Sequence, residues 1–195
     1  AIRSFGLDPQ KKTILIIGGS LGARTINNCV MQGLEKIKNS GVQFIWQTGK
    51  FYINEAKACV AQAGNLPMLY TTDFISDMAA AYSAADLVIS RAGAGSISEF
   101  CLLQKPVILV PSPNVAEDHQ TKNALALVNK EAALYVKDSE ATQKLLDLAI
   151  ATVGQADTLT KLSTNIAKLA FKDSANVIAN EVYKLAVNYK KEHER

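Results

Sequence analysis

The sequence is poor in cysteine and histidine, and its charges almost balance. Only three of its 195 residues are cysteines and two are histidines. Cys29, Cys59 and Cys101 lie far apart and form no Cys-x-x-Cys pair, which argues against a disulfide framework or a zinc site and favours a reducing compartment. The net charge of +3 is small and scattered, so it gives no electrostatic reason to expect a nucleic-acid partner.

Long apolar runs are missing as well. No stretch of about 18 apolar residues occurs, so we expect no membrane-spanning helix. The chain starts at Ala1 with neither an initiator methionine nor a signal peptide, and we expect it to be a piece of a longer protein. Its 48% hydrophobic and 20% charged residues are typical of a folded globular domain.

Short apolar runs alternate with stretches of helical periodicity over most of the chain. Residues 13–17 are apolar and β-branched and end at two glycines, as a buried parallel strand does. Strands are predicted at 13–17, 42–47, 68–74, 86–90, 107–110 and 134–136, and the intervening helices at 22–38, 53–63, 77–85, 96–103 and 119–130. This order predicts an α/β fold: a Rossmann-like parallel sheet of about six strands with helices on both faces.

Three helices are predicted after Ser139, over residues 140–153, 158–171 and 174–190. The last helix carries an apolar stripe that includes Val177, Val182 and Leu185. Such a stripe must cover either this domain or another part of the protein.

A glycine-rich segment, Gly-Gly-Ser-Leu-Gly-Ala-Arg at residues 18–24, follows the first strand and opens into a helix. Ligands of an open parallel sheet bind beyond the carboxyl ends of its strands. Glycine lets the backbone approach a phosphate, and a helix N-terminus attracts one, although tight turns also use glycine for steric reasons alone. The segment is neither the G-x-G-x-x-G dinucleotide fingerprint nor a P-loop.

A second glycine-rich turn, residues 90–99, follows the fourth strand. Two such turns on one sheet are harder to explain by sterics than one. Glu99 falls in about the first turn of the next helix, where either the helix dipole stabilises it or ribose hydroxyls donate to it. Arg91 pairs with either Glu99 or a phosphate, and the sequence leaves both partners open.

Polar residues also follow the fifth strand. His119, Gln120 and Asn123 have helical spacing, so one helix end can present all three side chains. Amide groups suit sugar hydroxyls because each has donors and an acceptor. The alternative is a polar helix start capped by Asp118.

Together these motifs resemble the C-terminal half of the MurG family, the N-acetylglucosaminyltransferases that convert lipid I to lipid II in peptidoglycan synthesis. The matching segments are Gly-Gly-Ser-x-Gly-Ala-Arg at 18–24, Phe-Ile-x-Asp-Met at 74–78, Arg-x-Gly-Ala at 91–94, Ser-Glu at 98–99, Asp-His-Gln at 118–120 and Asn-Ala at 123–124. The resemblance runs from about Ile2 to Lys190. It departs at Leu21, where glutamine is common, at Gly95-Ser96, where some members have Leu-Thr, and at His119, where others carry glutamine.

The resemblance implies the C-terminal half of a GT-B glycosyltransferase whose donor is UDP-N-acetylglucosamine. Residues 1–173 would form the donor-binding domain, and residues 174–195 a C-terminal helix that packs towards the absent N-terminal domain. By position, Ile75 would bind uracil, Glu99 the ribose, and Ser20 and Ser96 the diphosphate. The implied donor contacts are Arg3, Gly19, Ser20, Ile75, Arg91, Ala94, Ser96, Glu99, His119, Gln120 and Asn123.

The resemblance also implies an inverting hexosyltransferase that uses no cofactor or metal ion. It would act in bacterial cell-wall biogenesis, cell shape and cell division, bound peripherally at the cytoplasmic side of the inner membrane. The family's N-terminal domain, which binds lipid I and supplies the catalytic residues, is absent, so we expect donor binding without turnover. Two alternatives stay open: half of another GT-B-fold UDP-sugar transferase or epimerase, or a non-catalytic regulatory GT-B-like domain.

Overall fold

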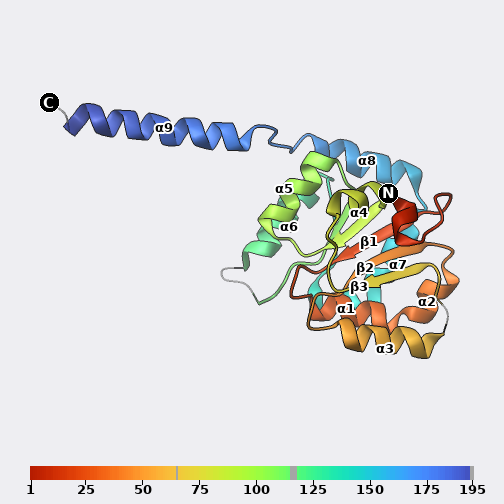
Figure 1. Ribbon diagram of the computed structural model, residues 1–195. Coiled ribbons are helices and arrows are strands. Elements are labelled where there is room, and N and C mark those ends of the chain that lie inside the picture. Colours follow the sequence, from red (N-terminus) through yellow and green to blue (C-terminus); the bar gives the residue numbers. More distant parts are fainter. Residues whose placement is uncertain (65, 115–117, 194–195) are drawn as a thin grey trace.

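A twisted parallel sheet forms the centre of the computed structural model, which describes residues 1–64, 66–114 and 118–193 (Figure 1). Within these ranges the strand order is β3-β2-β1-β4-β5-β6. The strands are β1 (Thr13–Ile17), β2 (Gln43–Gln47), β3 (Leu69–Thr72), β4 (Leu87–Ser90), β5 (Val107–Leu109) and β6 (Leu134–Tyr135), and every pairing is parallel. The predicted fold class is therefore confirmed.

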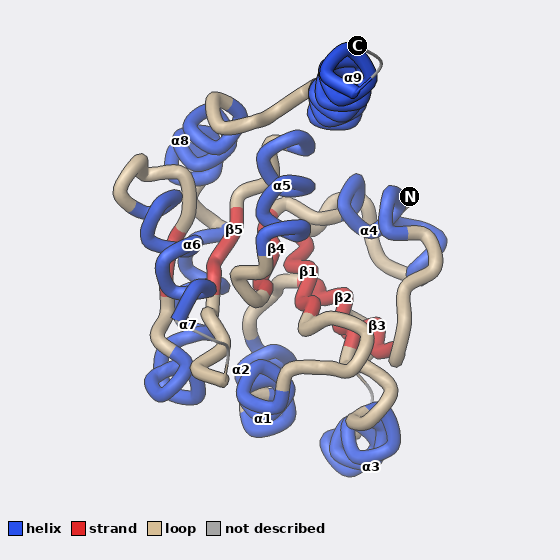
Figure 2. Tube along the Cα trace, turned by 90° about the vertical axis from the view of Figure 1, so that its left-hand side faces the viewer, coloured by secondary structure: helices blue, strands red, loops and turns tan. Residues whose placement is uncertain are grey.

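Helices separate successive strands and continue after the last one. They are η1 (Ile2–Phe5), α1 (Arg24–Gln32), α2 (Leu34–Asn39), α3 (Ile53–Ala63), α4 (Met78–Ala84), α5 (Ala94–Leu103), α6 (His119–Val128), η3 (Asp138–Glu140), α7 (Ala141–Val153), α8 (Ala156–Ala167) and α9 (Ser174–His193). Figure 2 shows α1, α2 and α3 on one side of the sheet and α4, α5 and α8 on the other.

The core has two layers because successive strand residues point to opposite faces of the sheet. Ile14 and Ile16 of β1 pack with α1, α2, α3 and α7, whereas Leu15 and Ile17 pack with α4, α5, α6 and α8. All five residues of β1 are buried. A central strand covered on both faces explains why residues 14–17 form an uninterrupted apolar run.

The helix predicted over 22–38 is wrong in one respect, because Gly33 divides it into α1 and α2. Gly33 has non-helical dihedral angles, with φ −100° and ψ 14°. A Cβ atom at this position would lie 2.2 Å from Cδ1 of Leu146 on α7. The close approach of α7 therefore requires glycine, a long-range contact that the helical periodicity of the segment does not reveal.

The three cysteines are free: Cys29 and Cys101 are buried, and Cys59 is half-buried. Burial raises the pKa of both the Cys29 and the Cys101 thiols. In the ranges that the structure describes, no group of three or more His, Cys, Asp or Glu side chains could hold a metal ion. No helix of those ranges has the length and apolarity to cross a bilayer.

Helix α9 extends away from the body of the molecule as a single rod (Figure 1). Its apolar stripe is exposed: the exposed fraction is 57% for Val177, 60% for Val182 and 69% for Leu185. The stripe therefore does not cover the sheet domain.

The order of the sheet creates a crevice between the loops that follow β1 and β4. From β1 the chain moves outwards to β2 and β3 and then returns to the other side of β1 to form β4. At such a reversal the two loops diverge at the carboxyl edge, which is where open α/β sheets bind ligands. Both glycine-rich turns of the sequence lie at this point.

Substitution of Gly22 tests how tightly the glycine-rich turn after β1 is packed. It has φ +90°, and a Cβ atom there would lie 2.3 Å from the Thr48 carbonyl oxygen. We expect Gly22→Ala to lower the free energy of unfolding by about 3 kcal/mol, through positive-φ strain and overpacking. Gly41→Ala, at φ +72° with no atom within 4 Å, is the control and should cost about 1 kcal/mol. Equal losses in urea denaturation would contradict this packing.

Candidate functional site

Two adjoining cavities lie at the carboxyl edge of the sheet. The larger, of about 660 Å³, is lined by the turn after β1, by residues after β4 and β5 and by Asp138. The smaller, of about 260 Å³, reaches from the same turn to Ile75, Tyr82 and Glu99. Both are lined by Gly18, Gly19, Arg91 and Gln120, so they form one continuous cleft.

The glycines of the first turn have different roles. A Cβ atom at Gly18 would lie 2.6 Å from the Ala23 nitrogen, so Gly18, like Gly22, is required by the tightness of the turn. Gly19 has φ +84°, lines both cavities, and has no atom within 4 Å of an added Cβ. Gly19 therefore leaves the backbone open towards the cleft, and the exposed Ser20 beside it lines the larger cavity.

Helix α5 begins at Ala94, two residues before its predicted start at Ser96. Glu99 is consequently the sixth residue of α5, so the prediction that it lies in about the first turn is wrong, and helix-dipole stabilisation does not explain it. Gly93 and Gly95 flank the helix start and have no atom within 4 Å of an added Cβ. Neither α1 nor α5 has a side-chain cap, so both helix starts keep backbone N–H groups for an anion.

A buried tyrosine holds Glu99. The Tyr82 hydroxyl on α4 donates a hydrogen bond of 2.9 Å to Oε2 of Glu99. Burial raises the pKa of the Tyr82 hydroxyl above its ordinary value, and the hydrogen bond to the carboxylate raises it further, so the hydroxyl remains a donor. Both side chains line the smaller cavity.

Arg91 pairs with Asp138 and not with Glu99, the one side chain considered for it from the sequence; its pairing with a phosphate stays a prediction. Its Nη1 contacts Oδ1 of Asp138 and donates to the carbonyl oxygens of Val110 and Pro111 at 3.0 and 3.1 Å. The second oxygen of Asp138 accepts a hydrogen bond of 2.9 Å from the Thr25 hydroxyl. The Arg91 and Asp138 side chains are only 17% and 18% exposed. This ion pair joins the segments that follow β1, β4, β5 and β6.

Two amide side chains of α6 form hydrogen bonds with the backbone of Ala92. Oε1 of Gln120 accepts hydrogen bonds from the backbone nitrogens of Ala92 and Ser112, at 3.2 and 2.9 Å. Nδ2 of Asn123 donates to the Ala92 carbonyl oxygen at 3.2 Å. These bonds fix the amide orientations: Gln120 keeps its NH₂ group for a ligand, and Asn123 keeps its carbonyl oxygen.

The alternative in which Asp118 caps α6 is wrong. Asp118 is the N-cap residue with φ 53°, but its side chain makes no capping hydrogen bond. Its Oδ1 instead accepts a hydrogen bond of 2.6 Å from the Thr121 hydroxyl.

The structure brings together most of the predicted donor contacts. Those that line the cleft are Gly19, Ser20, Ile75, Arg91, Ser96, Glu99 and Gln120. Asn123 adjoins the cleft through Ala92. Ala94 and His119 are the first residues of α5 and α6 and line neither cavity. Arg3, exposed on η1, also lines neither.

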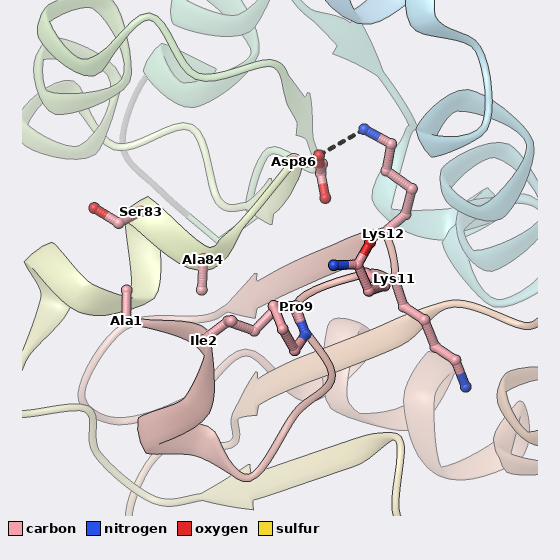
Figure 3. Close-up of a pocket in the computed structure, with 9 residues that line it drawn as sticks. Ala1, Ile2, Pro9, Lys11, Lys12, Ser83, Ala84 and Asp86 are labelled. Atoms are coloured by element: carbon pink, nitrogen blue, oxygen red, sulfur yellow. Dashed lines mark hydrogen bonds and ion pairs between the residues drawn. The ribbon is translucent and has the colours of Figure 1, made fainter.

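Another cavity, of about 390 Å³, lies at the opposite edge of the sheet (Figure 3). Lys12 and Asp86 precede β1 and β4 there and form an ion pair of 2.8 Å. The second oxygen of Asp86 accepts a hydrogen bond from the Thr13 nitrogen at 2.9 Å. This polar pair joins the amino ends of two strands and is remote from the carboxyl edge, where α/β sheets bind ligands.

Tyr82 and Asp138 were missed from the sequence for different reasons. Asp138 follows β6, so inspection of the residues after every predicted strand would have found it. Tyr82 lies within α4 and carries no motif, and only the packing of α4 beside α5 brings it to Glu99.

The partly buried ion pair predicts the effect of Asp138→Ala. Removing one partner leaves the Arg91 charge mostly out of water and without its carboxylate, so we expect the free energy of unfolding to fall by about 2 kcal/mol. Asp147→Ala is the control: it breaks the exposed pair with Lys36 and should cost about 0.5 kcal/mol or less. Urea denaturation measures both losses, and similar values would contradict a structural role for the Arg91 pair.

Comparisons with known proteins agree on a family. Residues 13–181 match the family described as glycosyltransferase family 28 C-terminal domain. The UDP-N-acetylglucosamine--N-acetylmuramyl-(pentapeptide) pyrophosphoryl-undecaprenol N-acetylglucosamine transferase of Phocaeicola vulgatus is 81% identical over 195 residues, which are 100% of this chain and 52% of that protein. The protein of the same name from Bacteroides fragilis is 71% identical over 187 residues, 95% of this chain and 49% of that protein.

A solved structure supports the same assignment. The crystal structure of Acinetobacter baumannii MurG is 30% identical, with a TM-score of 0.79, and the match covers 93% of this chain and 52% of that one. This chain thus spans about half the length of the curated relatives that it matches. Because the family match covers most of its length, the chain belongs to the glycosyltransferase family 28 C-terminal domain family.

Proposed function

We propose that this chain is the donor-binding half of a glycosyltransferase and that its cleft holds UDP-N-acetylglucosamine. One observation carries the proposal: a carboxylate, two glycine-rich turns and two oriented amides line or border one cleft at the reversal of the sheet. These groups suit, in order, a ribose diol, a diphosphate and a sugar. The relatives named above carry the same donor in their names.

The smaller cavity would take the uridine. Ile75 is buried and lines this cavity, and its backbone would bind the uracil ring. Glu99 is exposed at the same cavity with one oxygen held by Tyr82, and its carboxylate would accept hydrogen bonds from the ribose hydroxyls. Ser96, in the first turn of α5, would face the diphosphate.

The larger cavity would take the diphosphate and the sugar. Gly19 and Ser20 would meet the diphosphate, whose developing charge the uncapped starts of α1 and α5 stabilise as UDP departs. The NH₂ group of Gln120 would donate to a sugar oxygen, and the carbonyl of Asn123 would accept from a sugar hydroxyl. Ala94 and His119 would complete the sugar contacts from the helix starts.

Arg91 would act on the donor indirectly. The Arg91 guanidinium pairs with Asp138 and donates hydrogen bonds to two carbonyl oxygens. We therefore infer that this residue holds the loops of the cleft in place. Arg3 lies outside both cavities and would reach the nucleotide only when the second half of the protein is present.

The complete protein would carry out an inverting transfer. The C4 hydroxyl of the muramyl sugar of lipid I attacks the anomeric carbon of the donor, the bond to UDP breaks, and lipid II forms. The half outside this chain would bind lipid I, associate with the cytoplasmic side of the bacterial inner membrane, and supply the group that removes the hydroxyl proton. This chain alone would bind donor without turnover.

We also propose a division of the chain at residue 173. Residues 1–173 would form the donor-binding domain, and residues 174–195 would reach the other half of the protein. The exposed apolar stripe of α9 and the half-length match to relatives support this division.

Glu99→Ala tests the ribose contact. We expect the affinity for UDP-N-acetylglucosamine to fall roughly 10- to 100-fold, because hydrogen bonds to a charged group are lost. Isothermal titration calorimetry on the 195-residue chain measures this change. Glu55→Ala, which removes an exposed carboxylate from α3, should bind as the unchanged chain does. Equal binding by Glu99→Ala would remove Glu99 from the ribose role, and absence of any UDP binding would refute the nucleotide site.

The exposed stripe of α9 predicts self-association of this chain at high concentration, because the apolar surface is left without its partner domain. Sedimentation velocity at increasing concentration should show a growing dimer fraction. Leu185→Glu should abolish it, whereas Asn180→Glu, on the opposite face of the helix, should not. A monomer at all concentrations would contradict this account of the stripe.

A further inference from the structure

Tyr82 lines the cleft but is not used directly by the donor contacts above. Tyr82 lies on α4 and is only 5% exposed. Its ring packs edge to face on the buried Phe100, with ring centroids 6.0 Å apart and an interplanar angle of 82°. The hydroxyl of this fixed ring reaches the Glu99 carboxylate at 2.9 Å. A hydroxyl on a buried, packed ring therefore donates a hydrogen bond to an exposed carboxylate.

This contact matters for the recognition of a vicinal diol. Two neighbouring ribose hydroxyls bind one carboxylate best when the plane of the carboxylate group is held in one orientation. An exposed glutamate samples several rotamers and must lose that freedom when a ligand binds. A hydrogen bond from a fixed ring holds one oxygen in advance, while the other oxygen and the remaining lone pairs stay available to the diol.

We propose that Tyr82 is a positioning residue, which orients the Glu99 carboxylate for the 2′ and 3′ hydroxyls of the donor's ribose. This inference rests on the proposed function, since it takes the smaller cavity as the uridine site. It assigns Tyr82 to the selection of ribonucleotides. Ligands that lack the diol gain nothing from an oriented carboxylate.

A purely structural role for Tyr82 makes a different prediction. If Tyr82 only stabilised the core, its ring would supply the whole contribution. Tyr82→Phe would then have no effect, because it preserves both the ring and its packing on Phe100. Any loss in general folding would weaken all nucleotides alike. A positioning role weakens only those that carry the diol.

The test compares UDP with 2′,3′-dideoxyuridine diphosphate by calorimetry on the 195-residue chain. We expect Tyr82→Phe to weaken UDP binding about five- to tenfold, because the Glu99 side chain must then be ordered when the ligand binds, and to leave binding of the dideoxy analogue unchanged. Tyr183→Phe, which removes a hydroxyl that is exposed on α9, is the matched control and should change neither affinity. In a Glu99→Ala background, Tyr82→Phe should have no further effect on UDP, because the two residues act as a coupled pair.

Three results would overturn the inference. They are an unchanged UDP affinity in Tyr82→Phe, an equal loss for both ligands, and a full additional loss in the Glu99→Ala background. If the unchanged chain bound neither nucleotide, the donor site itself would be refuted and the role of Tyr82 with it, a result distinct from the other three.

Discussion

The partly buried ion pair between Arg91 and Asp138 is the contact on which the cleft depends. It joins the segment after β4 to that after β6, while Arg91 also binds the carbonyl oxygens after β5 and Asp138 binds Thr25 of α1. Backbone hydrogen bonds from Lys50 to Ser20 and from Gly49 to Asp73 continue the chain of contacts to the segments after β2 and β3. Loops from all six strands are thus connected at one edge of the sheet.

The pairing of Arg91 with Asp138 affects which groups of the cleft can bind an anionic ligand. Arg91, which lines both cavities, is already paired with a carboxylate, so the cleft offers an anion backbone groups, helix N-termini and the exposed Arg24 side chain at the start of α1. The backbone groups are preorganised and need no reorientation as charge develops on a leaving group. The amides follow the same logic, because the Ala92 peptide fixes which end Gln120 and Asn123 present. Positioning by internal contacts is the common feature of the site.

The sequence predicted features that rest on local patterns and missed those that rest on distant contacts. The six strands were predictable because buried parallel strands are short apolar runs ending in turns, and the two glycine-rich turns followed from the position of strand ends. The break at Gly33 depends on Leu146, and the partner of Arg91 lies 47 residues away. Tyr82 reaches Glu99 only through the packing of α4 beside α5. The contacts of Gly33 and Tyr82 leave no local signature in the chain, and Asp138 is marked only by its position after β6.

In the site proposed above, the glycine-rich turn after β1 would hold the diphosphate while Arg91 stays paired with Asp138. A crystal structure of the chain with bound UDP tests it most directly. The account predicts uracil beside Ile75, ribose hydroxyls on Glu99, phosphate oxygens at Gly19 and Ser20, and an intact Arg91–Asp138 pair. UDP in another cavity, or Arg91 turned away from Asp138 to bind the phosphates, would contradict it.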